Sequence, residues 1–122
     1  MRYLFFVCIL ILSLLGGCYY DSTESLYPSL SQCDTTNVTY SNSIVPILSN
    51  NCYSCHSNAT YQSGGGVKFE NYTDLKVYVD NGKLYNAVAH TGPYPMPPSS
   101  PTLDDCKLAD FKKWINAGAP NN

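Results

Sequence analysis

Apolar residues recur along the chain at the spacing of short helices, and polar loops separate these stretches. In residues 41–52, Ile44, Ile47 and Leu48 follow the i, i+3, i+4 pattern of one helix face. Any of the three polar residues just before Ile44 can cap this helix, and Pro46 is tolerated only in its first turn. The pattern therefore predicts a short helix whose C-terminal end carries the stretch "NCYSCH".

Two further short helices are predicted after a loop that contains three consecutive glycines, 64–66. The first covers "DLKVYV" (74–79), with Thr73 as its candidate cap and Asn81–Gly82 at its end. The second covers "KLYNAVAH" (83–90), which has apolar residues at i and i+4 on one face.

The segment "TGPYPMPPSSP" (91–101) contains five prolines in eleven residues. Proline lacks the N–H that helices and sheet interiors require, so this segment is predicted to be a stiff, extended loop. No internal repeat and no run of strand-like segments is visible. The predicted fold class is therefore all-α, with three to four short helices and long loops.

The last helix has the clearest boundaries. Asp104 can cap its N-terminus, and a glycine followed by a proline lies just past its end. Within it, Leu108, Phe111 and Ile115 form an apolar stripe with Trp114 beside them. We expect this stripe to face the core.

The N-terminal stretch "MRYLFFVCILILSLLGGC" has the features of a targeting segment. The apolar run after Arg2 is too short for a membrane span, which needs about 20 apolar residues, but it fits a signal peptide. The small residues before Cys18 resemble the lipobox of bacterial lipoproteins, which implies cleavage before Cys18 and lipid attached to it. An uncleaved anchor helix is the alternative. Either arrangement tethers the protein to a membrane outside the cytoplasm.

These features divide the chain into three parts. Residues 1–17 are the predicted lipoprotein signal peptide, residues 18–32 a flexible tether, and residues 33–122 one domain. The length of 122 residues suits one modest core. Charged residues make up only 13% of the chain and the formal net charge is −2. Nucleic-acid binding calls for a clustered Lys/Arg face, so no nucleic-acid partner is expected.

The motif Cys52-x-x-Cys55-His56 is the candidate site of chemistry. A thioredoxin-like redox pair would follow a strand, whereas a helix is predicted before this motif. A zinc site would need a fourth ligand at a regular spacing, and an oxidising compartment disfavours thiolate ligands. Covalent haem attachment uses all three side chains, because the two thiols bond the porphyrin vinyl groups and His56 becomes an axial iron ligand. The haem interpretation is the one we favour.

The other axial position has two candidates. Met96 is the only methionine left after signal removal, and prolines on both sides stiffen its loop. A His–Met pair fills both positions and raises the reduction potential. His90 is the rival ligand, unless it only caps or hydrogen-bonds at the end of the third helix.

Cys33 and Cys106 remain once Cys8 leaves with the signal, Cys18 takes lipid and the motif holds haem. Export places both in an oxidising compartment, so a disulfide between them is expected. It would close a loop of about 70 residues and constrain the unfolded chain. The alternative is that Cys33 and Cys106 are unrelated buried thiols.

Three segments together resemble a class I monohaem cytochrome c domain, and more narrowly the haem c lipoproteins of Bacteroidetes-type bacteria: "ILSNNCYSCH", "MPP" and "CKLADFKKWINAGAP". The resemblance covers about residues 33–120. It implies a compact helical fold around one haem c, in which the first and last helices cross. It also implies thioether bonds at Cys52 and Cys55, with His56 as the proximal and Met96 as the distal ligand.

The resemblance implies an electron-transfer protein and not an enzyme. The leading hypothesis is a membrane-tethered, monomeric carrier that passes single electrons between redox proteins by Fe(II)/Fe(III) cycling. The alternatives are an electron-entry subunit of a larger oxidoreductase and a haem-based sensor. Without Arg2 the formal charge becomes −3, so partners with a positive docking patch are expected. The expected location is the periplasmic or outer-membrane face of a bacterial membrane.

Overall fold

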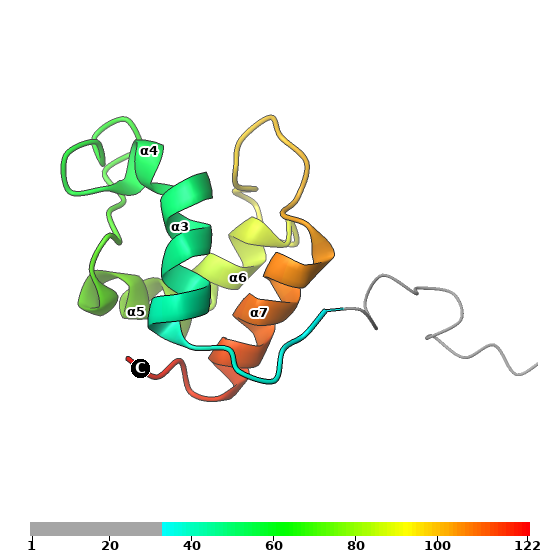
Figure 1. Ribbon diagram of the computed structural model, residues 1–122. Coiled ribbons are helices and arrows are strands. Elements are labelled where there is room, and N and C mark those ends of the chain that lie inside the picture. Colours follow the sequence, from blue (N-terminus) through cyan, green and yellow to red (C-terminus); the bar gives the residue numbers. More distant parts are fainter. Residues whose placement is uncertain (1–32) are drawn as a thin grey trace, which may run out of the picture.

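The computed structural model describes residues 33–122. The predicted signal peptide, Cys18 and the tether lie outside the described residues. Residues 33–122 form helices and loops and contain no strand, which confirms the all-α class for this part of the chain. The elements are a π-helical turn, Tyr40–Ile44, followed by α3 (Val45–Asn51), α4 (Tyr53–His56), α5 (Tyr72–Asp80), α6 (Lys83–Val88) and α7 (Asp105–Asn116) (Figure 1).

The first predicted helix begins earlier than expected and has a different cap. Thr39 accepts a hydrogen bond from the Asn42 N–H at 3.2 Å, so the cap is not among residues 41–43. The turn that follows is π-helical, and regular α-helix starts at Val45. Pro46 lies in the first turn of α3, as its missing N–H requires. The structure also adds the one-turn helix α4, so the prediction of three to four helices was too low.

The two middle helices lie where the sequence places them, with one corrected cap. Asn71, and not Thr73, caps α5 by accepting from the Asp74 N–H at 2.9 Å. The helix ends at Asn81–Gly82 as predicted, and Gly82 takes a positive φ of 73°, which glycine adopts without steric cost. The chain then enters α6 directly, and the two apolar residues of its predicted face are buried.

The core forms where the π-helical turn, α3, α5 and α7 contribute the largest fully buried side chains: Ile44, Leu48, Leu75, Phe111 and Trp114. In α7 the predicted stripe is partly wrong. Phe111 and Trp114 are buried, whereas the other two members of the stripe are only half-buried. The buried face is thus rotated toward Trp114, because Trp114 stacks on Tyr40 with ring centroids 5.8 Å apart. This contact joins the start of the first helical segment to the last helix.

The segment after α7 folds back over the same end of the molecule. The indole N–H of Trp114 donates to the Pro120 carbonyl at 2.9 Å. Asn122 accepts from two main-chain N–H groups at the start of the first helical turn: its side chain from Tyr40 and its carbonyl from Ser41, each at 2.9 Å. Asn122 therefore satisfies donors that a helix N-terminus leaves without partners.

A disulfide joins Cys33 to Cys106, with Cα atoms 5.1 Å apart and a separation of 73 positions in sequence. It attaches the beginning of the described chain to the first turn of α7. Every helix within residues 33–122 falls short of the length and apolar character that a membrane span requires.

Candidate functional site

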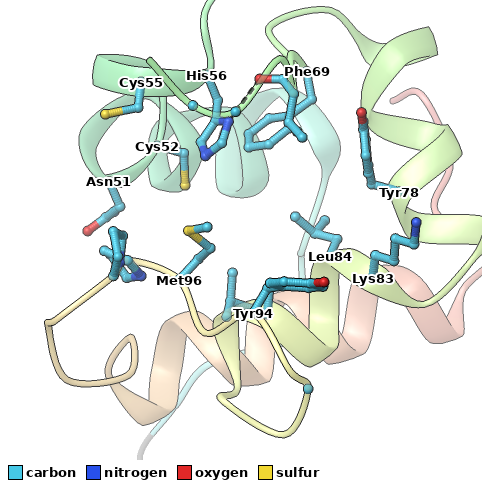
Figure 2. Close-up of a pocket in the computed structure, with 18 of the residues that line it drawn as sticks. Asn51, Cys52, Cys55, His56, Phe69, Tyr78, Lys83, Leu84, Tyr94 and Met96 are labelled. Carbon is cyan, nitrogen blue, oxygen red and sulfur yellow. Dashed lines mark hydrogen bonds between the residues drawn. The ribbon is translucent and has the colours of Figure 1, made fainter. Parts of the chain in front are cut away.

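A cavity of about 760 Å³ opens between α3–α4 on one side and α6 with the proline-rich loop on the other (Figure 2). Its size falls within the range of about 300–1,000 Å³ that is usual for small-molecule and cofactor sites. Apolar side chains dominate its wall, among them Val67, Phe69, Leu84, Val88 and Leu103. A mostly apolar wall favours an apolar ligand over a polar one.

The short helix α4 places the predicted motif on the cavity wall. Helix α3 ends at Asn51, and the main chain breaks at Cys52, with φ −129° and ψ −38°. The N–H groups of Cys55 and His56 then both donate to the Cys52 carbonyl, at 3.1 and 2.9 Å. This single turn brings all three motif side chains to one cavity. Figure 2 shows the Cys52 thiol and the His56 ring directed into the cavity, while the Cys55 thiol lies at its edge.

The orientation of the His56 imidazole is determined by residues 67–69. Nδ1 lies 2.9 Å from the Val67 carbonyl oxygen. A carbonyl can only accept, so Nδ1 carries a proton, and in the neutral imidazole Nε2 is then the nitrogen with the lone pair. Phe69 stacks on the ring, with centroids 4.8 Å apart and planes 23° apart, and its N–H donates to the His56 carbonyl at 3.1 Å. His56 therefore presents a fixed nitrogen ligand.

Gly64 lies directly against the His56 ring. A Cβ at this position would lie 2.6 Å from His56 Nδ1 and 2.5 Å from the Cys55 carbonyl oxygen. Both distances are shorter than real Cβ contacts. The sequence marked the glycine run only as a loop, but this glycine is required by close packing on the imidazole.

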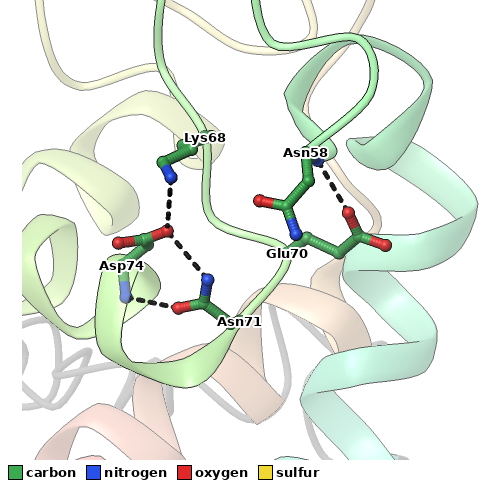
Figure 3. A network of polar contacts seen from close by, with 5 residues as sticks. All are labelled: Asn58, Lys68, Glu70, Asn71 and Asp74. Atoms are coloured by element: carbon green, nitrogen blue, oxygen red, sulfur yellow. Dashed lines mark hydrogen bonds and ion pairs between the residues drawn. The ribbon is translucent and has the colours of Figure 1, made fainter.

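A polar network anchors the loop on both sides of residue 69 (Figure 3). Lys68 forms an ion pair with Asp74 at 3.5 Å, and Asp74 also accepts from the Asn71 side chain at 2.8 Å. Glu70 accepts from the Asn58 N–H at 2.7 Å. Because these contacts attach the loop to the start of α5 and to the turn after α4, they hold residues 67–69 against His56.

Met96 reaches the cavity from the opposite wall, and Figure 2 shows its sulfur facing His56 and Cys52 across the open space. Its N–H donates to the Ala87 carbonyl at 3.0 Å. Its carbonyl accepts from His90 Nε2 at 3.1 Å. His90 is not among the cavity-lining residues, so the structure places it in the hydrogen-bonding role that the sequence left open beside ligation.

Burial controls the protonation of the Cys52 thiol. It raises the pKa of Cys52 to about 11, so this thiol is neutral at physiological pH. A reactive thiol pair needs a lowered pKa instead, and the described residues contain no strand before the motif. Within residues 33–122, no three His, Cys, Asp or Glu side chains cluster so that they could hold a metal ion. Among residues 33–122 the geometry therefore supports neither a thioredoxin-like pair nor a zinc site.

The structure brings the sequence-predicted residues Cys52, Cys55, His56 and Met96 to one cavity. The disulfide lies elsewhere, at the start of α7, and Cys18 lies outside the described residues. Comparison of the chain with family models, curated proteins and solved structures found no match. The function must therefore be inferred from the residues of this chain.

Proposed function

We propose that the chain is a class I monohaem cytochrome c, in which one haem c occupies the cavity and carries single electrons. The observation that carries this proposal is the placement of two iron-ligand types on opposite walls of one apolar cavity. The imidazole of His56 lies on one wall and the thioether of Met96 on the other, with the thiol of Cys52 near the imidazole and Cys55 at the edge of the cavity.

The residues fit such a group in three respects. The free Nε2 of His56 and the sulfur of Met96 are a known axial pair for haem iron. The thiols of Cys52 and Cys55 have the spacing for two thioether bonds to adjacent pyrroles. Gly64 permits the loop to approach the imidazole closely. When bound, haem c supplies a one-electron Fe(II)/Fe(III) couple.

The protein's own contribution would be to hold ligands and exclude water. The Val67 carbonyl accepts the Nδ1 proton of His56, which fixes the tautomer and increases the basicity of the ligating nitrogen. Apolar residues such as Leu84 and Val88 lower the dielectric around the site. A low dielectric disfavours the more highly charged oxidised state and so raises the reduction potential. If His56 and Met96 both held the iron, oxygen and peroxide would have no free position to bind, which would favour electron transfer over a sensor.

A membrane-tethered carrier is the main form of this proposal, with lipid on Cys18 holding a monomeric domain at the periplasmic or outer-membrane face. The second form is an electron-entry subunit bound to a catalytic partner. The formal charge of −3 after signal removal favours redox partners with a positive docking patch, and association that slows as salt rises. Stable co-purification with a dehydrogenase or reductase would favour the second form.

The test is a pyridine haemochrome spectrum of protein matured in a host that attaches haem c, with an oxidised-minus-reduced scan. We expect one haem per chain, held through heat denaturation and organic extraction because the bonds are covalent. The control replaces Cys52 and Cys55 with alanine and should lose covalent haem. Colourless mature protein whose two motif thiols both react with an alkylating reagent would refute the proposal.

A further inference from the structure

The main chain of Met96 is held at both of its polar atoms, by α6 and by the turn that follows α6. Its N–H donates to the Ala87 carbonyl at 3.0 Å, and its carbonyl accepts from His90 Nε2 at 3.1 Å. The residues on both sides of Met96 are prolines, which have no N–H to donate. The two hydrogen bonds therefore attach the Met96 main chain to α6 and to His90, where the neighbouring prolines can donate none.

His90 takes a main-chain conformation that ordinary residues avoid. Its φ is +54°, in the left-handed region, where a non-glycine residue costs about 1–2 kcal/mol. The next turn is held closely to α6, since the N–H groups of Thr91 and Gly92 both donate to the Asn86 carbonyl, at 3.0 and 3.1 Å. A Cβ on Gly92 would lie only 3.2 Å from the Asn86 Cβ. Strain of this kind persists where the surrounding structure requires it.

We propose that His90 is a positioning residue for Met96, and that its Nε2–H holds the Met96 carbonyl so that the thioether stays at the cavity. A carbonyl only accepts, so Nε2 must carry the proton and is not free to act as a ligand. The role of the thioether as an axial ligand rests on the proposed function. The hydrogen bond from His90 to the Met96 carbonyl is a property of the chain itself and can be measured separately.

Two variants separate hydrogen bonding from simple space filling. His90→Asn tolerates the positive φ but places its amide nitrogen nearer the main chain, so the donor at the ε position is lost. His90→Gln keeps an N–H donor at about the reach of Nε2. Both variants remove the imidazole, but they differ in two ways: Gln keeps the donor to Met96, whereas Asn adopts the φ of +54° more readily. A backbone effect alone would therefore weaken His90→Gln more than His90→Asn, which is the opposite of what loss of the hydrogen bond predicts.

The first measurement uses the mature holoprotein and follows the red charge-transfer band that marks thioether ligation while imidazole is added. We expect His90→Asn to lose half of this band at an imidazole concentration about 2- to 10-fold lower than the unaltered protein, as one lost hydrogen bond implies. His90→Gln should stay within about 2-fold. Equal sensitivity of all three proteins, or equal loss in both variants, would overturn the proposal.

The second measurement is hydrogen exchange at the Met96 amide, which donates to Ala87 whether or not the sulfur ligates iron. His90→Asn should exchange faster than His90→Gln by a similar factor of about 2- to 10-fold. If the unaltered holoprotein lacks the red band, ligation by Met96 is wrong. The exchange rates alone then test whether His90 positions the Met96 main chain. Unchanged exchange in His90→Asn would refute this positioning role.

Discussion

The close approach of Gly64 to the His56 imidazole leads to a sharp prediction for Gly64→Ala. The glycine does not have a positive φ, so alanine meets no backbone penalty there and the whole cost is steric. Its Cβ would lie 2.5 Å from the Cys55 carbonyl oxygen, about 0.9 Å inside ordinary van der Waals contact, and 2.6 Å from His56 Nδ1. Neither neighbour is the free end of a flexible side chain.

The expected loss of stability in Gly64→Ala follows from the groups that the added methyl must displace. Overpacking of this kind costs about 1–3 kcal/mol. Displacement of the imidazole also weakens the Nδ1–H···O bond to Val67, which adds about 1 kcal/mol. We therefore expect Gly64→Ala to lower the free energy of unfolding by about 2–4 kcal/mol. In the proposed holoprotein the nitrogen of His56 would hold the iron, so its movement should also change the visible spectrum.

Gly65 is the matched control in the same glycine run. It has a φ of +69° and open space where a Cβ would lie, so Gly65→Ala carries a backbone cost of about 1–2 kcal/mol and no contact with His56. Urea unfolding and visible spectra of both variants, with their haem content, make the comparison. Equal destabilisation with an unchanged spectrum in both would show that Gly64 has no special contact with the imidazole.

Three further outcomes test other parts of the structure. Replacing Cys33 and Cys106 with serine should lower the free energy of unfolding by about 4 kcal/mol, from the entropy of a 73-residue loop, and leave the haem spectrum unchanged; an unchanged urea midpoint would contradict this. Before haem attachment, Cys52 should alkylate about 100-fold more slowly at pH 8 than an ordinary thiol, because its pKa rises from 9.0 to about 11. Mass spectrometry should therefore find the first label on the exposed Cys55; equal labelling would show that Cys52 is not buried. Met96→Ala should abolish the red thioether band and let imidazole or carbon monoxide bind; a retained band would exclude Met96 as the ligand.

Local features of the sequence were sufficient for much of the helical framework. Asp104 caps α7 by accepting from the Lys107 N–H at 3.0 Å, as predicted, and a glycine follows the helix end. The boundary at Asn81–Gly82 was also predicted correctly. Caps and glycine turns act within a few residues, so the sequence contains the information needed to place them. The caps Thr39 and Asn71 were not predicted, because several neighbouring polar residues can each serve as a cap.

The central motif of the candidate site was also a local feature of the sequence. The spacing of Cys52, Cys55 and His56 within one short turn is a property of five consecutive residues. The proline residues around Met96 also identified a stiff loop. What the sequence determined was therefore which side chains are suited to hold a cofactor.

Only the tertiary structure decided how these parts face one another. Met96 lies 40 residues after His56 in the chain, and packing of the proline-rich loop on α6 brings it to the opposite wall of the same cavity. The Val67 carbonyl and the Phe69 ring carry no sequence signal, because any residue has a carbonyl and many apolar residues become buried. Trp114 is more deeply buried than most of the predicted stripe because Tyr40, 74 residues earlier, stacks against it. Such contacts depend on the packing of distant segments, so no local pattern contains them.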